Sequence, residues 1–344
     1  MCIIYSKRSF YIFLFSLAVC VTFSCASDPA DNPEGEGVEL SFATDGSSRA
    51  SVTTAINTKG SRFAVSGDMI KAEQGNSGSK RMVIFNNTEV EYDGTHWNYD
   101  EPRYWIPGYE YSFVAIHPAY FLSGTVNDSR YSSSALSFRY TIPILDEDRI
   151  NRDELTDITA ATHRRRYNDD GHFSAIPVRL NFFHALSRIT FQLKYYGEAD
   201  KVTITGIELE GVDKTATFTL VPAPLLDGAT QTDDYSLSWS DRSDRGTLIA
   251  DVNVDVGNGE TQRLCPDNDA LFMIPQPDNK GIIMKISYIY DRGNGPKELT
   301  LTAPAQIGGW EAGKIYSYSI ALNLVEEKGN LYFDVNVTDW TECA

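Results

Sequence analysis

The residue types that perform most catalytic and metal chemistry are scattered in this sequence. The five histidines are His96, His117, His163, His172 and His184, and the chain contains no HExxH, CxxC or GxSxG motif. Residues 308–314, GGWEAGK, have the glycine and lysine spacing of a phosphate-binding loop, but Ile315 stands where that loop needs Ser or Thr. We interpret the segment as a turn and predict a protein without enzymatic activity or cofactor.

Carboxylates and aromatic rings are the next candidates for binding chemistry. Residues 168–171 (NDDG) and 267–269 (DND) lack the alternating ligands and distant Glu of a calcium-binding loop, so we interpret both as turns and expect no metal. An aromatic-rich stretch follows residue 96, and its rings could stack on the apolar faces of sugars. The candidate ligand-binding residues are Trp97, Tyr104 and Trp105. Alternation along the strand favours the other interpretation, in which these rings fill a core.

The first 24 residues have the features of a secretory signal peptide. Lys7 and Arg8 precede an apolar run over residues 10–22, which is too short to span a bilayer comfortably. Cys25 follows the small residue Ser24, and residues 25–37 are acidic and contain Pro and Gly, as in a flexible tether.

Cys25 resembles the lipid acceptor of a bacterial lipoprotein, although Thr22 departs from the usual Leu. Cys20 as the acceptor and a secreted form without lipid remain alternatives. If Cys25 is acylated, Cys265 and Cys343 are left in the mature chain, so at most one disulfide is possible and nothing in the sequence requires it.

Arg49 is a candidate site of proteolytic processing. It lies in the polar loop DGSSRA, directly after a strand pattern over residues 38–44. A trypsin-like protease that cuts between Arg49 and Ala50 would free this strand from the body of the protein. Loss of the strand would leave unpaired backbone donors and acceptors in a groove, which a strand from another chain could fill. An ordinary loop arginine is an equally good interpretation.

Length and charge limit the classes of protein that fit. A chain of 344 residues with 42% hydrophobic residues can form about two globular domains, each with its own core. The net charge of −17 would repel a phosphate backbone, so we expect no nucleic-acid partner.

Apolar and polar residues alternate with a period of two, which predicts an all-β fold of many short strands. We expect a turn at residues 211–213, a loop over 225–243 and a helix, if any, only at 153–166. Within residues 178–196 the parity of the alternation changes, which indicates two strands that meet at a corner. We interpret this corner as the junction of two β-domains. Further strands are predicted at 82–92, 136–142, 201–209, 215–220, 248–256, 282–290, 314–324 and 331–337.

Several segments together resemble the fimbrillin-family lipoproteins of Bacteroidales, a group that includes fimbrial subunits and their accessory proteins. Besides the lipoprotein-like start, the matching segments are RFAVSGD at 62–68, YWIPGYEYSFVAIHP at 104–118, LNFFHALSRITFQL at 180–193, WEAGKIYSYSIAL at 310–322 and VTDW at 337–340. Each segment is weak alone, but the set covers nearly the whole mature chain.

The resemblance implies two transthyretin-like β-sandwich domains in tandem, at 38–184 and 185–344, after a signal peptide at 1–24 and an acidic tether at 25–37. It also implies an acylated Cys25, an outer-membrane or fimbrial location, processing between Arg49 and Ala50, and strand exchange with other fimbrial subunits. The one segment available for donation is 331–337. The alternative is a monomeric outer-membrane lipoprotein that binds a glycan or a host ligand without polymerising.

Overall fold

Short strands with alternating burial account for most of the chain, as the period-two pattern predicts. The computed structural model describes residues 38–44, 56–71, 80–122, 130–132, 135–167, 176–265, 270–276, 281–291, 293, 295, 297–304, 309–325 and 329–340. The strands form three larger sheets and one short pair, so the all-β expectation is confirmed. No helix among the described residues is long and apolar enough to span a membrane.

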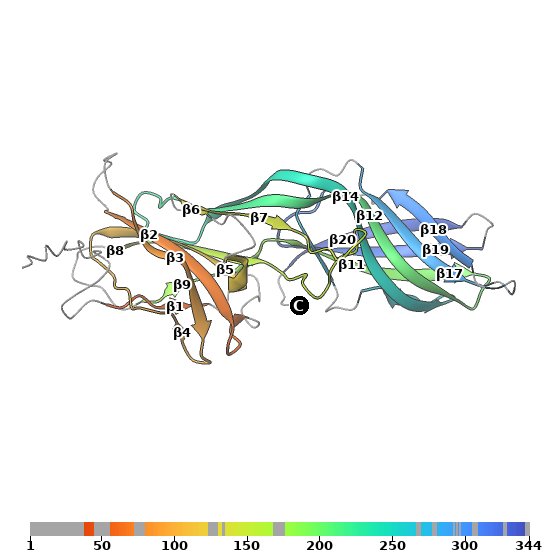
Figure 1. Cartoon of the computed structure of the whole chain (residues 1–344), viewed down its shortest axis with the longest axis horizontal. Coiled ribbons are helices and arrows are strands. Elements are labelled where there is room, and N and C mark those ends of the chain that lie inside the picture. Colours follow the sequence, from red (N-terminus) through yellow and green to blue (C-terminus); the bar gives the residue numbers. More distant parts are fainter. Residues whose placement is uncertain are drawn as a thin grey trace, which may run out of the picture.

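The first sheet gathers most strands from the first half of the chain. Its order is β10-β8-β5-β2-β3-β4, with β13 paired to β8. The bounds are β2 Arg62–Lys71, β3 Met82–Tyr92, β4 Trp97–Asn98, β5 Tyr109–His117, β8 Thr159–Tyr167, β10 Phe183–His184 and β13 Gln231–Thr232. The short parallel pair of β1 (Phe42–Ala43) and β9 (Val178–Arg179) lies beside this sheet, at the left in Figure 1.

The second and third sheets hold most of the strands of the C-terminal half, and the two long strands β12 and β14 belong to the second sheet. The second has the order β18-β17-β12-β7-β6, with β14 paired to β12, and the third has the order β15-β11-β19-β20, with β16 paired to β11. The bounds in the second sheet are β6 Arg130–Ser132, β7 Ala135–Thr141, β12 Lys201–Pro222, β14 Tyr235–Gly257, β17 Ile283–Tyr290 and β18 Lys297–Pro304. Those in the third are β11 Ser187–Gly197, β15 Thr261–Arg263, β16 Leu271–Met273, β19 Lys314–Leu324 and β20 Asn330–Asp339.

Strand β12 joins the two halves of an elongated molecule (Figure 1). Its residues 202–210 pair with β17, and its residues 215–220 pair with β7. The predicted turn at 211–213 is therefore wrong: Gly211 adopts a positive φ of 79° at a register shift, and the strand continues through this bulge. The predicted loop at 225–243 is also wrong in its second half, because β14 begins at Tyr235. The domain boundary at 184/185 stays a prediction.

The first sheet is covered on both faces, which explains a further error. On one face Ala64, Val114 and Ile116 pack in a core that continues into the C-terminal half; on the other, Phe63 and Phe113 pack in a second, aromatic core. Strand β8 is consequently buried on both faces over residues 159–163 and loses the alternation that marks a half-exposed strand. The helix considered at 153–166 is wrong, because residues 159–167 pair along β5 as a strand.

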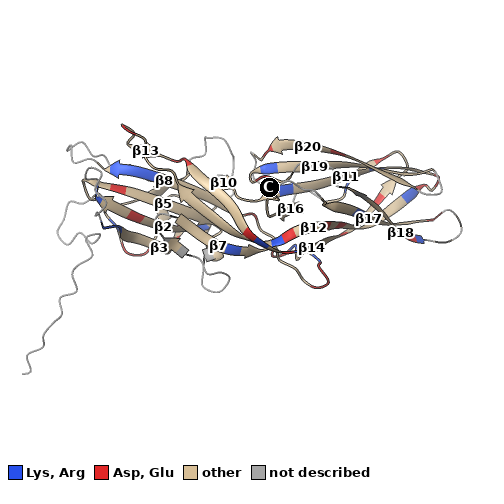
Figure 2. Ribbon diagram, turned by 90° about the horizontal axis from the view of Figure 1, so that it is seen from above, with Lys and Arg blue, Asp and Glu red and all other residues tan. Residues whose placement is uncertain are grey.

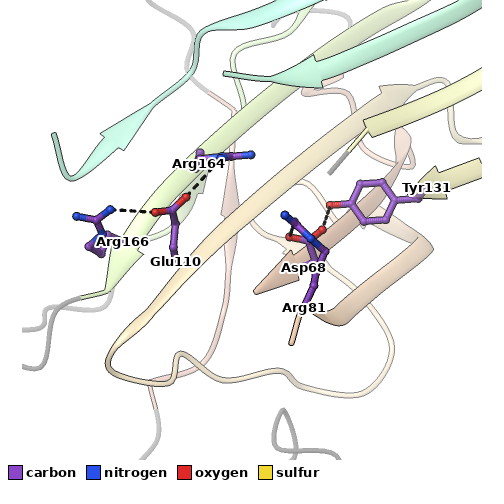
Figure 3. A network of polar contacts seen from close by, with 6 residues as sticks. All are labelled: Asp68, Arg81, Glu110, Tyr131, Arg164 and Arg166. Carbon is purple, nitrogen blue, oxygen red and sulfur yellow. Dashed lines mark hydrogen bonds and ion pairs between the residues drawn. The ribbon is translucent and has the colours of Figure 1, made fainter. Parts of the chain in front are cut away.

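A buried polar network links the first and second sheets (Figure 3). Asp68 on β2 is 1% exposed, and its carboxylate accepts hydrogen bonds from Arg81 Nη1 at 2.5 Å and from the hydroxyl of Tyr131, on β6, at 2.9 Å. On the same sheet Glu110 pairs with two arginines of β8, the strand that carries a basic run in Figure 2. The contacts with Arg81 and Tyr131 satisfy the buried carboxylate of Asp68, which would be costly without partners, whereas Glu110 is only partly buried.

Candidate functional site

The segment 38–44 lies between two other stretches of backbone and is hydrogen-bonded to both. On one side Leu40 N donates to Arg103 O at 2.7 Å, and Trp105 N donates to Val38 O at 2.9 Å. On the other side the amides of residues 178 and 180 donate to Ser41 O at 2.7 Å and Ala43 O at 2.8 Å. We call residues 38–44, with the flanking backbone of 103–105 and 178–180, the N-terminal strand site.

Two apolar side chains fix the segment in the aromatic core. Leu40 is 1% exposed and Phe42 is 5% exposed, while Glu39, which precedes Leu40, and Ser41, which lies between the two, are exposed. The ring of Phe42 meets four others edge-on, with centroid distances of 5.5 to 6.2 Å, and these rings are Phe63, Phe85, Tyr99 and Phe113. Burial of each apolar side chain contributes about 1.5–3 kcal/mol.

Tyr99 adds a polar anchor to this apolar site. Its hydroxyl donates a hydrogen bond to Leu40 O at 2.6 Å. Burial raises the pKa of Tyr99 to about 12, against a smaller opposing effect of its contact with the Arg103 amide. The hydroxyl therefore stays protonated, and remains a donor, over the whole physiological pH range.

The geometry of the N-terminal strand site is that of a groove filled by one strand. If residues 38–44 left, the amides of Trp105, Val178 and Leu180 and the carbonyl of Arg103 would lose the partners described above. Buried backbone groups without partners are costly, so another extended segment would be drawn to the same place. Such a segment would need apolar residues at alternate positions to replace Leu40 and Phe42.

The C-terminal strand, the predicted donor, is packed in its own sheet. Strand β20 pairs antiparallel with β19 in a continuous register from Lys314↔Asp339 to Asn323↔Asn330. Trp340, which follows it, is 3% exposed and lies between the rings of His184, at 3.6 Å, and Phe272, at 5.5 Å. Trp340 N donates to Gly313 O at 2.8 Å. The end of the strand is thus anchored near the junction of the two halves.

The structure describes only some of the predicted site residues. Cys25, Arg49, Ala50 and Cys343 lie outside the described residues, so lipidation of Cys25 and processing between Arg49 and Ala50 stay predictions. The stretches NDDG at 168–171 and DND at 267–269 also lie outside them.

The aromatic candidates do not form an open stacking surface. Trp97 and Trp105 are 7% and 3% exposed, and their rings pack on Phe63 at 4.7 Å and on Tyr111 at 4.6 Å. Tyr104 is half-buried and forms a backbone bridge with Glu39, beside the N-terminal segment. The stacking interpretation fails for the two tryptophans because burial in the aromatic core covers both rings.

Sequence reasoning missed the walls of the N-terminal strand site. Tyr99, Arg103 and residues 178–180 come from distant parts of the chain, and no local pattern marks them as neighbours of residues 38–44. The one available signal was the density of aromatic residues. It indicated an aromatic core, but it did not indicate which residues of the core are in contact.

Among the described residues the nearest approach to catalytic geometry is Ser61 Oγ, 3.2 Å from His117 Nε2. The carboxylate that would complete a triad is engaged elsewhere, since Asp157 Oδ2 lies 2.6 Å from His184 Nδ1. The described residues also contain no group of three or more His, Cys, Asp or Glu side chains that could hold a metal ion.

Comparison with known proteins finds one matching family and a solved structure with a similar fold. A sequence model described as fimbrillin-like matches residues 48–340. A fimbrial protein from Bacteroides vulgatus ATCC 8482 has a similar fold, with a TM-score of 0.62 and 16% identity over 88% of this chain and 99% of that one. A candidate cell adhesion protein from Bacteroides ovatus ATCC 8483 has a TM-score of 0.49 and 13% identity over 89% and 98%. Among curated proteins none matches significantly.

Proposed function

Because the chain belongs to the fimbrillin-like family, we propose that it is a cell-surface fimbrial subunit or accessory component with a structural or adhesive role and no catalysis. The observation that supports this most directly is the N-terminal strand site. A seven-residue segment fills a groove between residues 103–105 and 178–180, and it is the segment that cleavage after Arg49 would detach.

The proposed sequence of events begins with acylation of Cys25 and transport to the outer membrane. Cleavage between Arg49 and Ala50 then separates the segment from the rest of the chain. While it is covalently attached, its rebinding is intramolecular and therefore favoured; once cut, it gains translational and conformational freedom when it leaves. The open groove accepts a strand from another subunit, which restores the backbone hydrogen bonds.

The packing of β20 adds a distinction between two roles. A subunit that donates this strand must break its pairing with β19 and withdraw Trp340 from between His184 and Phe272. A subunit that keeps β20 in place can accept a strand without donating one, and would end a polymer rather than extend it.

The proposal is tested in native cells by the Arg49→Ala variant, with Ser48→Ala as the neighbouring control that keeps the cleavage site. We expect wild type and Ser48→Ala to begin at Ala50 and to form detergent-resistant ladders, and Arg49→Ala to begin at an acylated Cys25 and remain monomeric. N-terminal peptide masses and gel ladders give both readouts. Unchanged ladders in Arg49→Ala would remove Arg49 from the mechanism, and a wild type that begins at acylated Cys25 without ladders would favour a monomeric surface lipoprotein.

A further inference from the structure

A hollow of about 370 Å³ lies on the outer face of the third sheet, apart from the N-terminal strand site. Its volume falls in the range of small-molecule sites, which is about 300–1,000 Å³. Phe191 and Leu193 of β11 are buried, so the alternate residues Gln192 and Lys194 point outward and line the hollow. Two rows of outward residues cross β15, β11, β19 and β20 here, with Thr261, Lys194, Ala321 and Tyr332 in the first row and Arg263, Gln192, Ser319 and Asp334 in the second.

The first row forms the floor and one wall of this hollow. Ala321 is small and stands between two long side chains, Lys194 on β11 and Tyr332 on β20. Tyr332 is 60% exposed, so its ring is accessible at the edge of the hollow. A tyrosine ring offers a flat apolar surface to the apolar face of a pyranose, and its hydroxyl can bond to the edge of the sugar.

The second row supplies polar groups at the same place. Gln192 Nε2 donates a hydrogen bond to Ser319 Oγ at 2.6 Å, which orients the amide. The carboxylate of Asp334 and the hydroxyl of Thr261 also line the hollow. Amide, hydroxyl and carboxylate groups together can donate and accept hydrogen bonds, as the many hydroxyls of a sugar require.

A second hollow, of about 320 Å³, adjoins the first at Gln192 and has a basic lining. Arg188 and Arg263 line it, and no Asp or Glu is among its described lining residues. Arg188 is 8% exposed, and its guanidinium carbon lies 5.8 Å from the centre of the Trp340 ring, so its position is fixed by packing. This second hollow is therefore suited to an anionic group.

The charge of the two hollows is opposite to that of the whole chain. Their described lining contains three cations, Arg188, Lys194 and Arg263, and one carboxylate, Asp334. The chain as a whole has a net charge of −17. A locally positive surface on an acidic protein attracts anionic groups, so it complements a ligand of negative charge.

The position on the face of a sheet favours a sugar over a peptide. Strand β19 is paired with β11 on one side and β20 on the other, and β11 is paired with β19 and with β15 and β16. Because these backbone groups already have partners, an extended peptide cannot add to β11 or β19 as a further strand. A sugar is recognised by side chains alone.

We propose that the two hollows together bind an acidic oligosaccharide, with one pyranose ring against Tyr332 and the carboxylate of the adjoining sugar unit at Arg188 and Arg263. The inference gives a ligand class to the adhesive role and rests on the proposed function in that respect. Because Tyr332 and Asp334 belong to β20, a chain must keep β20 on β19 to have the complete site.

The test is a calorimetric titration of the full mature chain with three probes, which measures sugar binding separately from the ladders that test fimbrial assembly. We expect trigalacturonic acid to bind saturably and its methyl ester to bind about tenfold more weakly, because charge-assisted hydrogen bonds are the stronger ones. Equal binding of the acid and the ester would overturn the proposal, because the arginines would then have no role. Tighter binding of triglutamate than of trigalacturonic acid would identify an acidic polypeptide as the ligand and contradict the proposal.

Variants locate the binding on the third sheet. Tyr332→Ala should weaken the binding of trigalacturonic acid about tenfold through loss of the stacked ring, and Arg263→Gln should weaken it severalfold through loss of one charge. Tyr120→Ala and Lys201→Gln remove an exposed ring and an exposed charge elsewhere, on η1 (Ala119–Leu122) and on β12, and should leave the affinity unchanged. Melting temperatures verify that each variant is folded. Absence of saturable binding of trigalacturonic acid to the wild type, or equal affinity in Tyr332→Ala and wild type, would refute the site.

Discussion

Phe42 and Tyr99 show how single residues hold the N-terminal segment in two different ways. Phe42 contributes apolar area in the centre of four rings, and Tyr99 holds the backbone at Leu40 O by a single hydrogen bond. The first interaction is strong but tolerates any apolar side chain of similar size. The hydrogen bond from Tyr99 fixes how deep in the groove a strand lies, because its acceptor is a backbone carbonyl and not a side chain.

Tyr99→Phe should lower the free energy of unfolding at neutral pH by about 0.5–1.5 kcal/mol, the net contribution of one hydrogen bond. Because the pKa of Tyr99 is raised from 10.0 to about 12 on folding, its neutral form is favoured in the folded state. This stabilisation is complete below pH 10 and is lost as pH rises through 12. The difference between wild type and Tyr99→Phe should therefore shrink above pH 10, which urea unfolding across pH 7–11 would measure.

Tyr104→Phe is the matched control for that series. Tyr104 is half-buried on the neighbouring stretch, and its hydroxyl makes no hydrogen bond with the described residues. It should change stability by less than about 0.5 kcal/mol at any pH in the series. Equal effects of the two substitutions would show that the Tyr99 hydroxyl does not hold the segment.

At the scale of elements, β12 is the strand on which both halves depend. It crosses from the partner β17 to the partner β7 at a bulge, and Gly211 occupies the bulge with φ of 79°. A Cβ at this position would lie 2.7 Å from the backbone oxygen of Gly281. Both the backbone conformation and the close approach therefore require glycine there.

Gly211→Ala should lower the free energy of unfolding by about 1–3 kcal/mol, because alanine is strained at positive φ and meets the Gly281 backbone. Gly206→Ala, in the same strand, is the control: its nearest neighbour would be Ser287 Cβ at 3.9 Å, an ordinary contact. We expect it to be neutral or slightly stabilising. Urea unfolding of both variants would compare them, and equal losses would mean that the bulge is not a constrained point.

At the scale of the whole molecule, the N-terminal segment and β20 lie in different parts of an elongated body (Figure 1). Strand exchange between such molecules would link them end to end, since the groove belongs to the aromatic core of the N-terminal half and β20 to the third sheet. The proposed polymer thus depends on which strand occupies the groove. A peptide added in solution that binds in the groove should compete with the strand of another subunit.

A chain that begins at Ala50 should bind an added peptide of the sequence VELSFAT, residues 38–44, and the bound peptide should suppress polymer formation. The same peptide with Ala in place of Phe42 should bind at least about a hundredfold more weakly, because removal of a buried phenylalanine costs roughly 3–5 kcal/mol. Fluorescence titration and gel ladders measure the two effects. Polymers that form equally well with excess peptide would show that the groove is not the site of assembly.

The sequence by itself determined the all-β class, many of the strands and the family resemblance. Strands β3 and β19 have the bounds that alternation predicts, and β17 begins one residue after its predicted start. These features are local: a period of two reports that one face of a segment is buried, and it can be read from neighbouring residues alone. The method failed at β8, where burial on both faces removes the alternation.

Only the tertiary structure decided which strands are neighbours, and the proposed function depends on that choice. Alternation gives no pairing partner, so the position of residues 38–44 between 103–105 and 178–180 and the return of β20 to β19 were not accessible from the sequence. The same limit applies to Trp97 and Trp105, whose rings are covered by residues from other strands. The physical reason is that backbone hydrogen bonds and apolar contacts are satisfied by any extended partner, and only the complete packing selects one.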